Sequence, residues 1–346
     1  MTMTNHESTR PFIIPVFIPH AGCPHQCVFC NQRAITGNTN AVPSAEAITS
    51  QIQGFLKFKK PYHSPVQISF YGGNFLGLEE NTLYQLLNTA TTFVETGEVE
   101  SIRFSTRPDT IRPHSLDIIQ QFPIHTIEIG VQSMDDVVLE RSRRGHTSLD
   151  IKTACNALRP FGYEIGMQMM IGLPGDDDST AMKTAHSIAE LLPDFVRIYP
   201  TIVLKNSQLE KWYRQGSYLP MSLEAAVTQT KKLYLLFRKH GISVIRMGLQ
   251  ASEELDDSAT VLGGPYHPAF GHLVHAEIFL DMAIAELTSK AMPIQKAIFF
   301  VHPNSIPKMR GLKNANIRRL KDKYHINSIE LVPDASLASD TLRVEV

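Results

Sequence analysis

The strongest constraint on the fold is a repeated alternation of short apolar runs with segments of helical spacing. Runs rich in β-branched and aromatic residues predict buried strands. Six such strand–helix units open before residue 220, with strands expected at 12–18, 66–71, 101–106, 125–131, 162–171 and 195–201. Alternation of this kind favours a parallel sheet with helical crossovers, and units of about 30 residues suit a barrel. The sequence therefore predicts an α/β fold, a partial (β/α)6 barrel related to the TIM barrel.

The pattern changes after residue 250, which suggests a second unit. A loop-like stretch containing Gly263-Gly264-Pro265 comes first. A predicted helix at 268–289 follows, and then a strand, a helix and a strand at 294–301, 314–324 and 328–332. We therefore expect a barrel domain over residues 1–250 and a small C-terminal α+β extension with a basic helix over residues 251–346.

Charge and hydropathy exclude several classes of protein. The net charge is −1, so a role at nucleic acid or membrane must come from a local patch. No apolar run approaches the ~20 residues that a membrane helix needs, and the polar first ten residues lack the apolar stretch of a signal peptide. We expect a cytoplasmic protein with no membrane association. Only four cysteines occur in 346 residues, too few for a disulfide framework.

Three of these cysteines, Cys23, Cys27 and Cys30, form a C-x-x-x-C-x-x-C motif in the loop after the first predicted strand. Iron–sulfur cubanes normally take four cysteines, so three leave one iron open to another ligand. The alternative is a non-catalytic zinc-binding protein, with a Cys₃His site completed by His25 or His20. The remaining cysteine, Cys155, lies in a predicted helix and reads as a small buried apolar residue.

The cysteine motif, including the aromatic Phe29 before the third cysteine, resembles the signature of the radical S-adenosylmethionine (SAM) superfamily. The resemblance implies a 4Fe–4S cluster held by Cys23, Cys27 and Cys30, whose open iron is chelated by the amino and carboxylate groups of SAM. It also implies reductive cleavage of SAM to a 5′-deoxyadenosyl radical, which requires a low-potential electron donor. The sequence assigns no further catalytic side chain.

Polar residues and glycines follow the predicted strands, at the edge where barrel enzymes carry their active residues. The resemblance gives them roles toward SAM. Gly72, Gly73 and Asn74 stand where the superfamily binds the methionine amino group, with Asn74 in place of an acid. Arg144 stands where related enzymes hold the methionine carboxylate, a group that guanidinium can grip with two hydrogen bonds. The complete set of implied cofactor-binding residues is Phe29, Gly72, Gly73, Asn74, Ser105, Gln132, Arg144 and Gln168, of which Ser105, Gln132 and Gln168 correspond to ribose contacts.

Several stretches resemble the elongator catalytic-subunit family over roughly residues 12–250. They are residues 105–109, 130–133, 144–147 and 196–201, continuing through Leu209, Trp212, Gly216 and Tyr218. Members of that family modify the wobble uridine of transfer RNA (tRNA) and carry a C-terminal acetyltransferase domain. Residues after 250 leave no room for such a domain, so we expect the radical domain alone. RNA, and tRNA in particular, is the implied substrate. Oxygen-independent coproporphyrinogen oxidases share parts of the pattern, so a small metabolite such as a tetrapyrrole is the alternative.

A basic segment near the C-terminus supports the RNA hypothesis. Seven cations occur against one acid, Asp322: Lys308, Arg310, Lys313, Arg318, Arg319, Lys321 and Lys323. Such a block is a candidate for contacts with backbone phosphates. The alternative is an ordinary solvated helix face.

Overall fold

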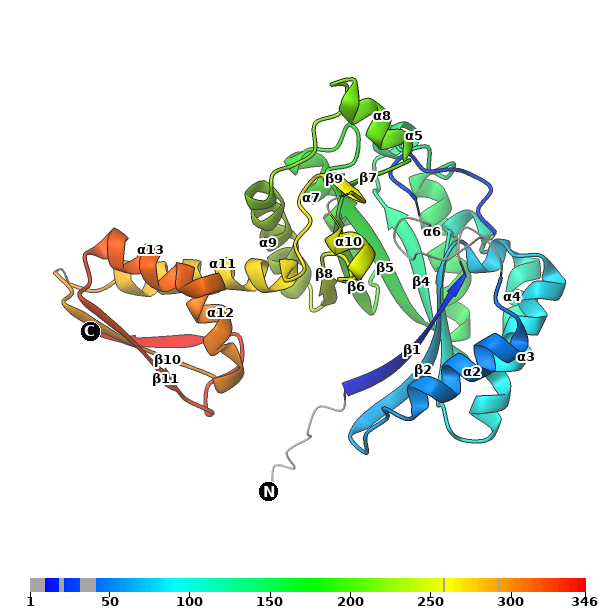
Figure 1. The fold of residues 1–346 in the computed structure, drawn as a ribbon, viewed down its shortest axis with the longest axis horizontal. Coiled ribbons are helices and arrows are strands. Elements are labelled where there is room, and N and C mark those ends of the chain that lie inside the picture. Colours follow the sequence, from blue (N-terminus) through cyan, green and yellow to red (C-terminus); the bar gives the residue numbers. More distant parts are fainter. Residues whose placement is uncertain (1–9, 19–21, 32–41, 258, 292) are drawn as a thin grey trace.

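The computed structural model describes residues 10–18, 22–31, 42–257, 259–291 and 293–346, and its centre is a curled parallel sheet (Figure 1). The sheet has seven strands in the order β1-β2-β3-β4-β5-β6-β8, and every neighbouring pair is parallel. The strands are β1 (Arg10–Ile18), β2 (His63–Gly72), β3 (Ser101–Thr106), β4 (Ile124–Gln132), β5 (Glu164–Ile171), β6 (Phe195–Pro200) and β8 (Ser243–Met247). The predicted α/β partial barrel is confirmed, with one strand more than the six expected.

Helices cover the convex face of this sheet. They are α2 (Ala45–Leu56), α3 (Glu80–Glu95), α4 (Pro113–Ile119), α5 (Asp136–Arg141), α6 (Ser148–Leu158), α7 (Asp178–Glu190) and α9 (Leu223–Lys239). Helix α8 (Gln208–Arg214) lies away from that face (Figure 1), and its Leu209 is bonded to Val28 in the loop after β1. Alternate strand residues such as Ile68, Phe104 and Ile129 are fully buried in one apolar core. Since successive side chains of a strand point to opposite faces, the residues between them face the concave side of the sheet.

The seventh strand, β8, escaped the sequence prediction because its pattern is weak. Its five residues contain a serine and an arginine, and its side chains are exposed or half-buried. It lies at the edge of the sheet and pairs with β6 alone. Two short strands, β7 (Val203–Leu204) and β9 (Val261–Gly263), form a separate antiparallel pair.

The C-terminal segment builds a second core around the long helix α11 (Phe270–Thr288). A three-stranded sheet of order β11-β10-β12 packs there, formed by β10 (Lys296–Val301), β11 (Ser328–Pro333) and β12 (Leu342–Glu345). Helices α10 (Glu253–Asp256), α12 (Ile306–Arg310) and α13 (Ala315–Tyr324) complete the segment. Val274 of α11 belongs to the barrel core and Leu280 to the second core. Thus α11 joins the two units, and the boundary at residue 250 stays a prediction.

None of the helices in the described ranges is long and apolar enough to cross a membrane.

Candidate active site

The cysteine loop, residues 23–30, follows β1 and is held from two sides. The backbone N–H of Val28 donates to the carbonyl of Ser142 at 3.2 Å, and the carbonyl of Val28 accepts from the N–H of Leu209 at 2.8 Å. The loop therefore lies between the segment after α5 and the start of α8. Cys27 is buried, Cys30 is half-buried and Cys23 is exposed.

This loop forms one wall of a pocket at the carboxyl ends of the strands. The pocket is lined by Cys23, His25, Gln26, Cys27, Phe29, Cys30, Gly72, Gly73, Ser105, Thr106, Arg107, Gly130, Gln132, Arg144 and Gln168. All the predicted metal and cofactor residues except Asn74 are in this set. The position agrees with the rule that the active residues of barrels cluster at the carboxyl ends of their strands.

The donor chemistry of the pocket fits an iron–sulfur cluster. Three thiols line it, and neither aspartate nor glutamate does. Thiolates are the ligands that iron–sulfur clusters take. Their side chains do not converge, since the described ranges contain no group of three histidines, cysteines or acids at metal-binding distance. His25 also lines the pocket, whereas His20 lies outside the described residues.

Two buried arginines line the pocket, and Arg107 is ion-paired with Asp109 at 2.9 Å. Arg144 donates one hydrogen bond to the Sγ of Cys27 at 3.1 Å and another to the carbonyl of Gly130 at 2.8 Å. Its Nε is buried without a hydrogen-bond partner. Although Cys23 reaches solvent, desolvation by the surrounding groups raises the pKa of its thiol and the nearby Cys27 raises it further, while Arg107 and Arg144 act in the opposite direction. Both arginines favour thiolates and carboxylates over their neutral forms.

The capping of α6 fixes the position of Arg144. The hydroxyl of Thr147 accepts from the N–H of Asp150 at 3.3 Å, and the carboxylate of Asp150 accepts from the N–H of Thr147 at 2.7 Å. This reciprocal pair is a capping box, which satisfies two backbone N–H groups at the start of the helix and so holds the turn before it. The same short turn includes Gly145, whose positive φ of 70° suits glycine.

A buried ionic network lies directly against the pocket. Gln168 donates from its Nε2 to the hydroxyl of Ser105 at 3.2 Å and to the carboxylate of Glu128 at 2.8 Å. Glu128 is fully buried and also accepts from Arg103 at 2.5 Å and Arg197 at 2.9 Å. Because a carboxylate between two guanidinium groups only accepts, the amide nitrogen of Gln168 must face it. The amide oxygen is then the acceptor that Gln168 offers to the pocket.

The sequence prediction missed Glu128, Arg103 and Arg197. The signal was present, because each is a charged residue inside an apolar strand. Isolated charges of this kind are almost never fully buried unless they are paired. Their strands, β3, β4 and β6, belong to one sheet, so the three residues were candidates for such a pairing.

The side chain of Asn74 forms hydrogen bonds within the chain. Its side chain is buried, and its Nδ2 donates to the carbonyl of Gly22 at 2.8 Å. Its Oδ1 accepts from the Thr106 hydroxyl at 2.7 Å and from the Arg107 N–H at 3.1 Å. The expected contact of Asn74 with a methionine amino group stays a prediction. Asn74 ties the residue before Cys23 to the end of β3.

We predict that Asn74→Ala lowers the free energy of unfolding by about 2–3 kcal/mol, since it leaves several buried polar groups without a partner. The same substitution should lower the iron content after reconstitution, because Gly22 loses its anchor. Urea denaturation and iron analysis measure the two effects. Asn81→Ala, at an exposed position of α3, is the control. Equal stability of the two variants would contradict this role for Asn74.

The fold and the pocket together define an enzyme of the radical SAM class. Comparison with known families agrees, and the chain belongs to the radical SAM superfamily: its family model matches residues 17–188, and the model of the Radical_SAM C-terminal domain matches residues 193–279.

Named relatives place the chain near enzymes of tRNA modification. It is 31% identical over 221 residues to an uncharacterized protein of Methanocaldococcus jannaschii, covering 60% of this chain and 66% of the relative. It is 24% identical over 230 residues to a tRNA uridine(34) acetyltransferase of Dehalococcoides mccartyi, covering 57% of this chain and 50% of the relative. The chain thus spans between half and about two thirds of the length of these relatives.

The fold is also similar to a solved structure, the archaeal Methanocaldococcus infernus Elp3 with an N-terminal deletion. The TM-score is 0.61 at 19% sequence identity, covering 78% of this chain and 63% of that one. At this identity the likeness concerns the fold.

Proposed function

We propose that this radical SAM enzyme holds a 4Fe–4S cluster on Cys23, Cys27 and Cys30, binds SAM beside it, and modifies RNA, with tRNA as its substrate. The observation that carries the proposal is the single pocket shared by three thiols and seven predicted SAM contacts. When bound, the reduced cluster and SAM supply a 5′-deoxyadenosyl radical. The chain's own residues orient the cosubstrate and exclude water.

Each wall of the pocket has a distinct part in binding SAM. The guanidinium of Arg144 suits the methionine carboxylate, whereas that of Arg107 already binds the carboxylate of Asp109. The amide oxygen of Gln168 accepts from a hydroxyl, and Gln132 lies on the same pocket wall. Gly72 also lines the pocket, and packing within the chain requires glycine there, because its φ is 105° and a Cβ would lie 2.6 Å from the carbonyl oxygen of Ile18.

Support for an RNA substrate comes from the relatives and from the basic segment. The names of several relatives describe tRNA modification. In the segment, Arg319 already pairs with Glu277, and Lys321 donates to the carbonyl of Asn327. Lys308 and Arg310 of α12 and Lys313 in the turn before α13 form no ion pair within the part of the chain that the structure describes, and we propose that they contribute to RNA binding.

The decisive experiment measures 5′-deoxyadenosine after anaerobic reconstitution with iron and sulfide. SAM, a reductant and either total RNA or a metabolite extract are added, and the nucleoside is quantified. We expect RNA to increase its release and the metabolite extract to have no effect. Cys155→Ala is a matched control, because this cysteine is buried in α6 and away from the pocket.

Other outcomes decide between the alternatives. Stimulation by the metabolite extract alone would replace RNA with a small-molecule substrate. A colourless protein that retains zinc and takes up no iron would overturn the enzyme proposal, and the three thiols would then belong to a zinc site.

A further inference from the structure

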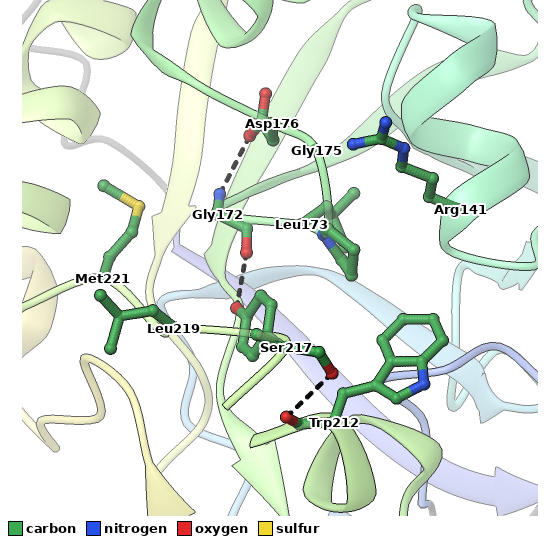
Figure 2. Close-up of a pocket in the computed structure, with 11 residues that line it drawn as sticks. Arg141, Gly172, Leu173, Gly175, Asp176, Trp212, Ser217, Leu219 and Met221 are labelled. Atoms are coloured by element: carbon green, nitrogen blue, oxygen red, sulfur yellow. Dashed lines mark hydrogen bonds between the residues drawn. The ribbon is translucent and has the colours of Figure 1, made fainter. Parts of the chain in front are cut away.

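A second cavity, of about 530 Å³, lies beside the cysteine loop (Figure 2). The loop after β5 forms one wall, and the segment from α8 to the start of α9 forms the other. The lining residues are Arg141, Gly172, Leu173, Pro174, Gly175, Asp176, Trp212, Ser217, Tyr218, Leu219 and Met221. The proposed function uses none of these side chains.

Hydrogen bonds within the chain fix the cavity walls and satisfy most of their polar groups. The N–H of Gly172 donates to the carboxylate of Asp176 at 2.9 Å, and the carbonyl of Gly172 accepts from the Tyr218 hydroxyl at 2.7 Å. Ser217 donates to the carbonyl of Trp212 at 3.1 Å. Figure 2 shows these three bonds. The walls are therefore shaped before any ligand binds.

Arg141 is the charged group that these bonds leave uncommitted. It is exposed, and it forms no hydrogen bond or ion pair with another residue in the described part of the chain. Gly175 lies against it, where a Cβ would come within 2.9 Å of the Arg141 side chain. A free guanidinium at the wall of a cavity suits an anionic group such as a phosphate.

The remaining surface is aromatic and aliphatic. Trp212 lines the cavity, and the guanidinium of Arg143 lies 6.0 Å from the centre of its ring. At the rim, Leu219 leaves 88% of its surface exposed. Covering a leucine with another apolar group is favourable, because it removes apolar surface from water. A flat apolar wall next to one free cation matches a nucleotide, whose base stacks on aromatic rings while its phosphate pairs with arginine.

The cavity is also close to the radical site. Val28 of the cysteine loop is bonded to Ser142 and to Leu209. Ser142 follows Arg141 in the chain, and Leu209 lies on α8, the helix that carries Trp212. Trp212 itself packs against the apolar cluster that contains Val28 and Phe29. The segments that line the cavity are thus bonded to the cysteine loop and packed against it.

We propose that this cavity binds one unpaired nucleotide of the RNA substrate, with its base against Trp212 and a phosphate on Arg141. The inference rests on the proposed function and deepens it, because it names the structural element of the RNA that is recognised. Unpaired nucleotides of this kind are found in loops and bulges, whose bases are free to leave the stack.

Trp212 is the only tryptophan of the chain, so its fluorescence reports on the cavity directly. The reconstituted full chain is titrated with a short single-stranded RNA, the same sequence as a duplex, AMP or UMP, and inorganic phosphate. We expect a saturable change with the single strand and a weaker response to the duplex. Mononucleotides that bind as tightly as the single strand would overturn the assignment to RNA. No fluorescence change with any probe would overturn the site.

Variants test the two contacts through the binding of a labelled single-stranded RNA. Arg141→Ala should raise its Kd about ten-fold, since a hydrogen bond to a charged group is lost. Lys152→Ala, which removes an exposed cation from α6, should change the Kd less than about two-fold. Equal weakening by both variants would show that only the overall charge matters, and would overturn the site.

Stacking on Trp212 is tested in the same way. Trp212→Ala should raise the Kd on the order of ten-fold, and Trp212→Phe should restore most of the affinity. Leu219→Ala, at the exposed rim, keeps the test valid if Trp212→Ala fails to fold, and it should also weaken binding. Unchanged affinity in both Leu219→Ala and Arg141→Ala would overturn the proposal.

The experiments distinguish failure of the nucleotide site from failure of the proposed RNA-modifying reaction. If RNA increases 5′-deoxyadenosine release and the cavity variants behave like the parent, the RNA enzyme stands and the nucleotide site is wrong. If the single strand binds through Arg141 and Trp212 while RNA leaves the release unchanged, the site stands and the proposed reaction is wrong.

Discussion

Replacing Cys27 with alanine should abolish cluster binding while the barrel stays folded. Iron should fall from about 4 per chain, as expected for one cubane, to background, and 5′-deoxyadenosine release should be lost with it. The thiol lies in a loop at the strand ends, and among the described residues its Sγ accepts one hydrogen bond, from Arg144. Its loss should cost roughly 1–2 kcal/mol of stability. Iron analysis, visible absorption and circular dichroism measure these effects.

The matched control for Cys27→Ala is Cys155→Ala. Cys155 is also buried, but it packs in the barrel core from α6, and burial raises the pKa of its thiol to about 11. A thiol that stays protonated is a poor ligand for a metal. Cys155→Ala should therefore keep its full iron content. Iron retained in Cys27→Ala, or a collapsed circular-dichroism spectrum in that variant, would contradict a cluster site in a surface loop.

The alternation of strands and helices was enough to predict the fold class. Strands such as β2 and β4 carry β-branched or aromatic residues at alternate positions, and this period of two is a strong signal for a strand with one face in an apolar core. The same reasoning failed at β8, an edge strand with a half-buried arginine, Arg246. Edge strands bury less side-chain surface, so their composition carries less information.

The candidate site could be predicted as a set of residues but not as a network. The cysteine spacing and the polar strand ends are local features, and they identified ten residues that line one pocket. The hydrogen bonds of the Asn74 side chain are formed with Gly22 and Thr106, which are distant in sequence. The ion pairs of Glu128 depend likewise on the register of three strands. Contacts across strands follow from the sheet, and a single sequence does not record them.

Removing the carboxylate of Glu128 should destabilise the protein more than any other single change discussed above. Glu128 is fully buried between Arg103 and Arg197, whose side chains are 6% and 10% exposed. Glu128→Ala leaves two buried guanidinium groups without their counter-charge, which should cost about 3–5 kcal/mol. The free energy of unfolding from urea denaturation measures this loss. Glu190→Ala, on the exposed face of α7, should stay within about 0.5 kcal/mol of the parent.

A triple substitution separates charge balance from packing in this network. Arg103→Met, Glu128→Leu and Arg197→Met together remove all three charges and keep similar side-chain volumes. Because no buried charge is left unpaired, the triple variant should be more stable than Glu128→Ala. Its affinity for SAM should nevertheless fall, since Gln168 loses the acceptor that orients its amide. If Glu128→Ala proved as stable as Glu190→Ala, the network would contribute little to the fold, and the orientation of Gln168 toward the pocket would need another cause.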